Sequence, residues 1–271
     1  MTDSQSVSSQ KPKIDTAIAH TARIWNYWLG GKDNYPVDRA VGDQIRQIHP
    51  GIGDYARADR AFLARAVRYL AGEAGIRQFL DIGTGLPTTN NTHQVAQSVA
   101  PEPRIVYVDN DPLVLAHARA LLTSKPEGAT AYIDADLRDP GAILAEAAHT
   151  LDFTQPVALT LLGVVIFIND DEDAYGIVRG LVDAVPSGSY LVLSHTVTSP
   201  ATGEMDAAVA FWNEHGTPKL TQRTASQITR FFDGLDLLEP GVVSCSRWRP
   251  DDTPRGEPDE VAMFGGVGRK R

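Results

Sequence analysis

The strongest constraint on the fold is an alternation that begins after Gly75, where short apolar runs are separated by helical segments of about a dozen residues. This order is typical of repeated βαβ units, whose strands form a parallel sheet with helices on both faces. The predicted strands are residues 78–82, 104–108, 130–133, 157–162 and 189–194. The predicted helices between them are residues 89–99, 112–122, 140–149 and 171–185. The sequence therefore predicts an α/β fold with a doubly wound parallel sheet.

Beyond residue 194 the spacing of the pattern loosens. The predicted elements there are a helix over residues 203–214, a helix opened by Thr224, and strands over residues 242–247 and 261–267. Gln227 follows Thr224 at the spacing of a capping box. Asp139 is a second predicted N-cap, since it precedes a proline at the start of a predicted helix. Residues 249–260 are rich in Pro and Asp and are predicted to form a surface loop.

The N-terminal part of the chain has a different character. Residues 1–13 lack an apolar core and are predicted to be a disordered tail. Residues 14–75 are predicted to be all-helical, with helices over residues 14–29, 36–48 and 54–72, and to form a lid over a site in the α/β domain, residues 76–271. The double glycine at residues 30–31 is a natural end for the first of these helices.

Composition excludes several classes of protein. The chain has 25 Lys and Arg against 34 Asp and Glu, a formal net charge of −9, so no nucleic-acid partner is expected. Its single cysteine, Cys245, cannot form an internal disulfide, which favours a reducing, cytoplasmic location. The longest uncharged stretch, residues 153–169, is shorter than the roughly 20 apolar residues of a membrane span. The histidines lack metal-ligand spacing, so no metal site is predicted.

A glycine turn follows the first predicted strand at residues 79–85 (FLDIGTG). Gly83 and Gly85 allow a positive φ and let the backbone approach a ligand with no Cβ in the way. The spacing continues to Thr88, so the third glycine of a dinucleotide-binding fingerprint is missing. A plain strand-to-helix turn is the alternative for the two glycines alone.

Acidic residues close three successive predicted strands: Asp81, Asp109 and Asp136. Asp109 has the position of a carboxylate that accepts both hydroxyls of a ribose, and Asp136 that of an acceptor for an adenine amine. Taken singly, Asp109 is also explained as a helix cap and Asp136 as a solvated loop acid. Asp81 would repel a pyrophosphate and attract an ammonium group, which favours S-adenosylmethionine over NAD or ATP.

With these features the chain resembles the class I S-adenosylmethionine-dependent methyltransferases, and more closely an actinobacterial methyltransferase family with a GGKDN stretch. The resemblance depends on residues 23–35 (RIWNYWLGGKDNY), 79–88 (FLDIGTGLPT) and 246–250 (SRWRP). It implies a Rossmann-like, mostly parallel sheet of seven strands in the order 3-2-1-4-5-7-6, the last one antiparallel, so that residues 76–271 form the methyltransferase domain.

The resemblance also implies which residues surround the cofactor. It places Gly83, Gly85, Asp109 and Asp136 there. Asn110 and Leu137, which directly follow two of these acids, are predicted to contact the cofactor with them. In the lid, the predicted cofactor contacts are Tyr27, Gly31 and Asn34, whereas core packing is favoured for Trp25 and Trp28.

The candidate catalytic base is His195, which directly follows the fifth predicted strand, at the sheet edge where sites of such folds lie. A histidine that is merely hydrogen-bonded there is the alternative. Where the family tends to carry a histidine after the fourth strand, this chain has Ile166, which favours a second hypothesis, a non-catalytic S-adenosylmethionine-binding sensor or interaction protein. The main prediction is a methyltransferase that acts on a small-molecule acceptor, its identity and the oligomeric state being undetermined.

Overall fold

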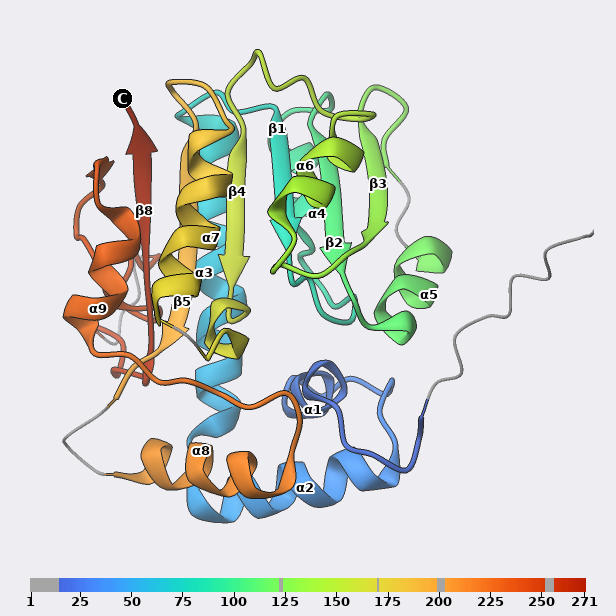
Figure 1. Cartoon of the computed structure of the whole chain (residues 1–271), viewed down its shortest axis with the longest axis vertical. Coiled ribbons are helices and arrows are strands. Elements are labelled where there is room, and N and C mark those ends of the chain that lie inside the picture. The colour runs from blue at the N-terminus through green and yellow to red at the C-terminus, as the bar shows by residue number, and fades with distance from the viewer. Residues whose placement is uncertain (1–14, 122–123, 170, 199–202, 252–255) are drawn as a thin grey trace, which may run out of the picture.

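The computed structural model describes residues 15–121, 124–169, 171–198, 203–251 and 256–271, so the predicted tail over residues 1–13 lies outside the described part. All described strands belong to one sheet (Figure 1). The strands are β1 (Gln78–Ile82), β2 (Arg104–Asp109), β3 (Ala129–Asp134), β4 (Ala158–Leu162), β5 (Tyr190–Thr196), β6 (Leu235–Leu237), β7 (Val243–Ser244) and β8 (Met263–Lys270).

The order of the strands in the sheet is β3-β2-β1-β4-β5-β8-β6, with β7 paired to β8. Strands β1 to β5 are parallel, and β8 runs antiparallel to β5, from the pair Tyr190 and Arg269 to the pair Thr196 and Met263. The order matches the predicted 3-2-1-4-5-7-6, with an antiparallel last strand, when β6 is counted as the sixth strand. The strand predicted over residues 242–247 is instead the short β7, which also pairs with β8. The doubly wound, mostly parallel fold is thus confirmed.

The helices also follow the predicted order. They are α1 (Thr21–Trp28), α2 (Pro36–Ile48), α3 (Ile52–Gly72), α4 (Thr92–Val99), α5 (Pro112–Leu121), α6 (Pro140–Ala147), α7 (Asp171–Asp183), α8 (Glu204–His215) and α9 (Ala225–Thr229). Two short 3₁₀ helices, η1 (Val165–Phe167) and η2 (Arg230–Phe232), follow β4 and α9. The predicted caps are present, since Asp139 accepts a hydrogen bond from the backbone of Ala142 and Thr224 forms a capping box with Gln227.

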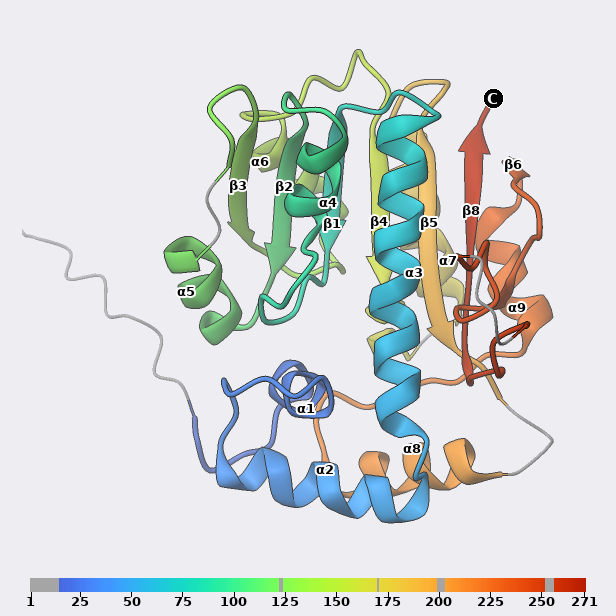
Figure 2. The ribbon, with the colours of Figure 1, turned by 180° about the vertical axis from the view of Figure 1, so that it is seen from behind.

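Helices cover both faces of the sheet. Figures 1 and 2 show α3 and α4 on one face and α6, α7 and α9 on the other. Phe62 and Leu70 of α3 are fully buried in the same apolar cluster as Phe79 of β1. On the opposite face Ile143 and Leu159 belong to a second cluster. Although α3 belongs to the predicted N-terminal lid, its apolar face is part of the main core.

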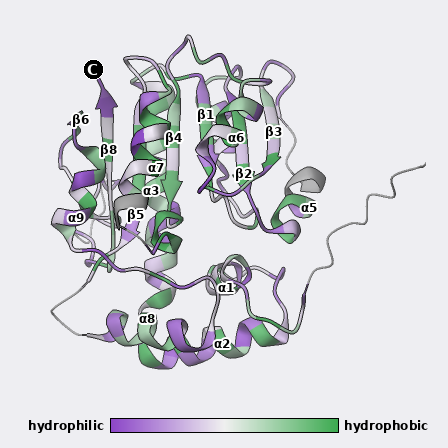
Figure 3. Ribbon diagram, in the orientation of Figure 1, coloured by the Kyte–Doolittle hydropathy of each residue, from purple (hydrophilic) through white to green (hydrophobic). Residues whose placement is uncertain are grey.

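Three helices, α1, α2 and α8, lie beyond the carboxyl ends of the parallel strands (Figures 1 and 2), and we call them the cap helices. The long helix α3 connects the two parts, because its first turns reach the cap and its later turns pack on the sheet. In Figure 3, α2 and α8 show both apolar and polar sectors, as helices with one buried and one exposed face do. No helix within the described ranges is long and apolar enough to cross a membrane.

Candidate functional site

A cavity of about 330 Å³ lies where the carboxyl ends of β1, β2, β3 and β4 face α1, and we call it the main cavity. The parallel order brings these strand ends to one edge of the sheet, the place where open α/β sheets bind ligands. Of the predicted site residues, seven line this cavity: Asp81, Gly83, Gly85, Asp109, Asn110, Asp136 and Leu137. The strand-end acids, which are 55 positions apart from first to last, therefore meet around one space.

The glycine turn forms the floor of the main cavity. Gly83 has φ +75°, and a Cβ there would lie 2.4 Å from the side chain of Val164, so the loop after β4 packs directly on this glycine. Gly85 has φ +63° with open space around it, and its backbone N–H donates to Asp109 Oδ2 at 2.9 Å. The turn is therefore built for close approach of a ligand and is held by the acid of the neighbouring strand.

Hydrogen bonds hold the buried Asp81 and the half-buried Asp109 in place. Asp81 accepts from Thr92 Oγ1 at 2.5 Å, and burial raises the pKa of its carboxyl. Asp109 accepts from the backbone of Gly85 and of Asp111, each at 2.9 Å. Burial nevertheless raises the pKa of Asp109 to about 6, because removal from water disfavours the charged form more than these bonds favour it.

Asp136, the third acid, is more exposed. Asn110 Nδ2 donates to its Oδ2 at 3.3 Å, and Arg138 lies within 3.3 Å of its carboxylate. Arg138 also donates to the carbonyl of Phe167 at 2.7 Å, so it links the loop after β3 to the loop after β4. These contacts hold the Asp136 carboxylate at the rim of the main cavity.

Sequence reasoning missed a further acid, Asp59 of α3, which lines the main cavity and is only 4% exposed. Ser194 Oγ at the end of β5 donates to Asp59 Oδ1 at 2.6 Å. Burial raises the pKa of Asp59 to about 6. In the sequence it stands beside arginines and resembles a surface charge. The available signal was its spacing, because Tyr55, Asp59 and Phe62 follow one another at three to four residues along the buried face of α3.

The sequence also predicted the wrong side of α1 to face the main cavity. Asn26 lines the cavity, whereas Tyr27 points to α2, where its hydroxyl donates to Asp43 at 2.6 Å. Gly31 and Asn34 do not line the cavity but support Asn26. Asn34 Nδ2 donates to Asn26 Oδ1 at 2.9 Å, and a Cβ on Gly31 would lie 2.3 Å from the Asn26 amide. A helix turns by about 100° per residue, so neighbouring positions face different surroundings.

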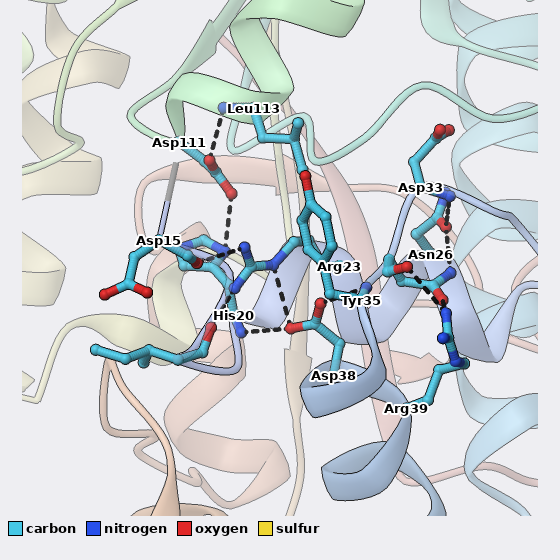
Figure 4. A network of polar contacts seen from close by, with 12 residues as sticks. Asp15, His20, Arg23, Asn26, Asp33, Tyr35, Asp38, Arg39, Asp111 and Leu113 are labelled. Carbon is cyan, nitrogen blue, oxygen red and sulfur yellow. Dashed lines mark hydrogen bonds and ion pairs between the residues drawn. The ribbon is translucent and has the colours of Figure 1, made fainter. Parts of the chain in front are cut away.

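The segment before α1 closes the main cavity on the side of α5. His20 lines the cavity, and its Nδ1 lies 2.9 Å from Asp111 Oδ2 at the start of α5 (Figure 4). The backbone N–H of His20 and the Nε of Arg23 both donate to Asp38 Oδ1, at 3.0 and 3.1 Å. Nearby, Leu113 is buried in a small apolar cluster. This polar network fixes the N-terminal segment to both α2 and α5.

His195, the predicted base, does not line the main cavity. Its side chain is fully buried, its Nδ1 lies 2.9 Å from the carbonyl of Thr196, and its Nε2 lies 2.6 Å from Arg223 Nη1. The guanidinium can only donate, so Nε2 accepts and Nδ1 carries the proton. Burial lowers the pKa of His195 to about 3. A ring with both nitrogens occupied has no position for a substrate proton, so the structure corrects the prediction of a catalytic base here.

The charges around the main cavity define the ligand it can take. Four acids line it, namely Asp59, Asp81, Asp109 and Asp136, against His20, Arg60 and Arg138. Such a lining favours a positively charged ligand that also carries hydroxyl donors. Within the described residues, no group of three His, Cys, Asp or Glu side chains is arranged to hold a metal ion.

Comparisons with known proteins agree with this geometry. The family of S-adenosyl methyltransferases matches residues 7–271. A DUF574 family protein from Streptomyces avermitilis MA-4680 is 49% identical over 96% of this chain and 100% of its own, with a TM-score of 0.91. A presumed methyltransferase from Thermobifida fusca YX is 40% identical over 98% of this chain and 100% of its own, with a TM-score of 0.87. A search of curated proteins gave no match.

A more distant structure shares the fold. The magnesium protoporphyrin IX methyltransferase of Synechocystis PCC 6803, solved with S-adenosylmethionine bound, is 13% identical over 92% of this chain and 90% of its own, with a TM-score of 0.51. The glycine cradle at Gly83 and Gly85 and the acidic lining fit a cofactor that carries a sulfonium, an ammonium group and a ribose. The chain therefore belongs to the S-adenosyl methyltransferase family, and S-adenosylmethionine is its cofactor.

Proposed function

We propose that this chain transfers the methyl group of S-adenosylmethionine to a small-molecule acceptor. The observation that supports this best is the meeting of Asp81, Asp109 and Asp136 around the main cavity, in the order of β1, β2 and β3. A cavity of about 330 Å³ is within the size range of small-molecule sites. Among the described residues, nothing beyond Ile166 supports a purely binding role.

Each part of the main cavity suits one part of the cofactor. Asp109 is the proposed acceptor for the ribose hydroxyls, and Asp136, Asn110 and Leu137 form the proposed adenine end. Asp81 is the proposed partner of the ammonium group, because a buried carboxylate beside the glycine turn attracts positive charge. Gly83 and Gly85 let the backbone lie against the ligand between these ends.

The stretch over residues 30–34 (GGKDN) supports the cofactor indirectly in this proposal. The backbone N–H of Asp33 and the side chain of Asn34 both donate to Asn26 Oδ1, at 3.0 and 2.9 Å. The amide of Asn26 is thereby fixed at the wall of the main cavity, while Gly31 leaves the room it needs. Gly31 and Asn34 therefore act as positioning residues, and Tyr27 fastens α1 to α2.

When bound, the cofactor supplies a methyl group on a positively charged sulfur. A lone pair of the acceptor attacks the methyl carbon, and the sulfur leaves with the electrons of its bond to that carbon. The protein must hold the acceptor in line and, for a hydroxyl or ammonium acceptor, remove a proton. Asp59 is the proposed proton acceptor. It lies in the main cavity, its Oδ1 is fixed by Ser194, and a pKa of about 6 leaves it ionised at neutral pH while keeping it basic. His195 has no such access.

Two variants test these roles separately. Asp109→Ala is expected to weaken S-adenosylhomocysteine binding by about 1–3 kcal/mol, the cost of losing hydrogen bonds to a buried ribose. Asp59→Asn is expected to bind that ligand but to transfer tritiated methyl groups to hydroxyl acceptors about 10²–10⁴-fold more slowly than wild type. Calorimetry measures the first effect and label transfer the second. Wild-type binding without transfer to any hydroxyl, amine or carbon acceptor in a broad set would contradict the proposed activity.

A further inference from the structure

A second, smaller space lies between the cap helices and the sheet, and we call it the apolar compartment. Its lining comes from α1, α2, the start of α3, η1, the end of β5 and α8. Five aromatic side chains line it: Trp25, Trp28, Tyr55, Phe167 and Trp212. Among the described residues that line it, none carries a charged side chain. Its chemistry is thus the opposite of the acidic main cavity.

The two spaces share a wall. Thr21, Trp25 and Phe167 line both the main cavity and the apolar compartment. Trp25 also reaches Gly163 after β4, where a Cβ would lie 3.7 Å from its ring. A molecule in the apolar compartment would therefore be separated from a ligand in the main cavity by a single layer of side chains.

The polar atoms of the apolar compartment are few and nearly all engaged. The indole N–H groups of Trp28 and Trp212 donate to backbone carbonyls at 3.2 and 2.7 Å. Tyr55 Oη and Thr196 Oγ1 lie 2.7 Å apart, and either hydroxyl can be the donor. This hydroxyl pair is the natural place for one uncharged polar group of a ligand.

The hydroxyl pair and Asp59 follow one another along the same two elements. Tyr55 and Asp59 are one turn apart on α3, and their partners Thr196 and Ser194 are two residues apart on β5. Positions four apart on a helix and two apart on a strand share a face. The row of side chains from the apolar compartment to the main cavity thus runs from two hydroxyls to a carboxylate.

We propose that the apolar compartment receives the methyl acceptor, and that the acceptor is an uncharged molecule with an apolar ring system and a hydroxyl group. This inference rests on the proposed methyltransferase function. The cofactor has a size that occupies the main cavity, which leaves the adjoining compartment for the second reactant. A charged acceptor would lose its hydration there without gaining a partner of opposite charge.

The apolar compartment must widen for such a molecule. Its volume is about 50 Å³, room for a few water molecules, whereas an engineered cavity that binds benzene measures about 150 Å³. Ala208 and Met205 of α8 line the compartment from the cap side. Outward movement of α8 or of these side chains is therefore part of acceptor binding. The shared side chains of Trp25 and Phe167 must also turn aside, because the acceptor has to touch the methyl group for transfer.

Binding of 2-naphthol in the presence of saturating S-adenosylhomocysteine tests the inference, with 6-hydroxy-2-naphthoate as the charged counterpart. Ala208→Phe fills the apolar compartment, and Ala207→Phe, on the exposed side of the same helix, is the matched control. Met205→Ala enlarges the compartment. It is included because it adds no bulky side chain that could disturb folding. Calorimetry gives the affinity for each ligand, and S-adenosylhomocysteine binding checks that each variant is folded.

Wild type and Ala207→Phe are expected to bind 2-naphthol equally, with at least tenfold weaker binding of the naphthoate. Ala208→Phe is expected to lose at least tenfold in 2-naphthol affinity, and Met205→Ala to gain at least twofold. Provided that S-adenosylhomocysteine binds, three results would overturn the inference. These are equal 2-naphthol affinity in all four proteins, no 2-naphthol binding in wild type, and tighter binding of the naphthoate. If wild type itself does not bind S-adenosylhomocysteine, the proposed function is overturned instead.

Discussion

His20 and Asp111 meet across the edge of the main cavity, with His20 Nδ1 2.9 Å from Asp111 Oδ2. The pair joins the segment before α1 to the residue that directly precedes α5, two regions separated by 91 positions in the chain. Asp111 also accepts a hydrogen bond from the backbone of Leu113 at 2.8 Å, so the start of α5 holds its carboxylate in place. Since His20 itself lines the main cavity, we expect separation of this pair to open a route into it.

Removing this pair is expected to speed cofactor release. His20→Ala should raise the dissociation rate of S-adenosylhomocysteine about two- to fivefold, the effect of losing a partly buried polar contact worth about 0.5–1 kcal/mol. Stopped-flow displacement measures the rate. His149→Ala is the matched control, because His149 pairs with Glu146 on an exposed surface outside the main cavity. A rate equal to that of the control would mean that the contact does not gate the cavity.

Cofactor affinity is expected to depend on pH through Asp109. The ribose hydroxyls donate to the ionised carboxylate, whose pKa in the free protein is raised by burial to about 6. Affinity should therefore rise with pH through 6, and fall about tenfold between pH 7.5 and pH 5. The same raised pKa makes the folded chain hold a proton between about pH 4 and 6 that the unfolded chain releases, so Asp109 lowers stability as pH rises through this window.

Calorimetric titration with S-adenosylhomocysteine from pH 5 to 8 checks this dependence. Asp109→Asn should bind more weakly and with a flatter profile. Asp136→Asn, at the exposed rim of the same cavity, should keep the wild-type profile. A flat profile in wild type would remove Asp109 from the ribose role.

The glycine turn can be tested with two glycines of equal backbone strain. Gly85 and Gly75 have φ of +63° and +71°, and neither would bring a Cβ within 4 Å of other atoms. Alanine at either position is expected to cost about 1 kcal/mol of stability from the left-handed backbone. Only Gly85→Ala should also weaken cofactor binding, by at least tenfold, because only Gly85 lines the main cavity. Equal affinities in the two variants would show that Gly85 serves the fold alone.

His195 is expected to act on stability rather than on binding. His195→Ala removes one acceptor of the buried Arg223, which still donates to the carbonyl of Ile168, and should cost about 1–3 kcal/mol in the free energy of unfolding, with S-adenosylhomocysteine affinity unchanged. The pKa of His195 is lowered from 6.5 to about 3 in the folded chain. Between these pH values the unfolded chain therefore binds a proton at His195 and the folded chain does not. Wild type therefore loses stability as pH falls, by about 2 kcal/mol at pH 5 from this residue alone.

Urea unfolding at pH 7 and pH 5 measures this term. The variant should lose about 2 kcal/mol less than wild type between the two pH values. An equal loss in both proteins would contradict the claim that burial lowers the pKa of His195. A large drop in the cofactor affinity of His195→Ala would show that His195 serves the binding site after all.

Much of the fold was predictable because each strand and helix has its own local signal. β1 was predicted with its observed bounds, and the caps Asp139 and Thr224 are where the sequence placed them. β6 was missed because three residues are too few to show a strand period. The first helix starts at Thr21 and not at residue 14, since residues 15–20 are held by tertiary contacts such as Arg23 to the carbonyl of Asp15.

The main cavity was partly predictable for a similar reason. Asp81, Asp109 and Asp136 lie at or just after the ends of parallel strands, so topology alone brings them together. Asp59 was missed although its spacing from Tyr55 and Phe62 places it on the apolar side of α3. Asn26 was missed because which side of α1 faces the sheet depends on how the helix packs. His195 was misjudged because its position at a strand end does not reveal that Arg223, from another part of the chain, covers its ring.

The most direct test of the account is a calorimetric titration of the purified chain with S-adenosylmethionine, S-adenosylhomocysteine and NAD in parallel. Micromolar binding of the two sulfur ligands, and none of NAD, is the predicted result, because the acidic main cavity attracts an ammonium group and repels a pyrophosphate. Binding of NAD, or of none of the three ligands, would contradict the roles given to Asp81, Asp109 and Asp136.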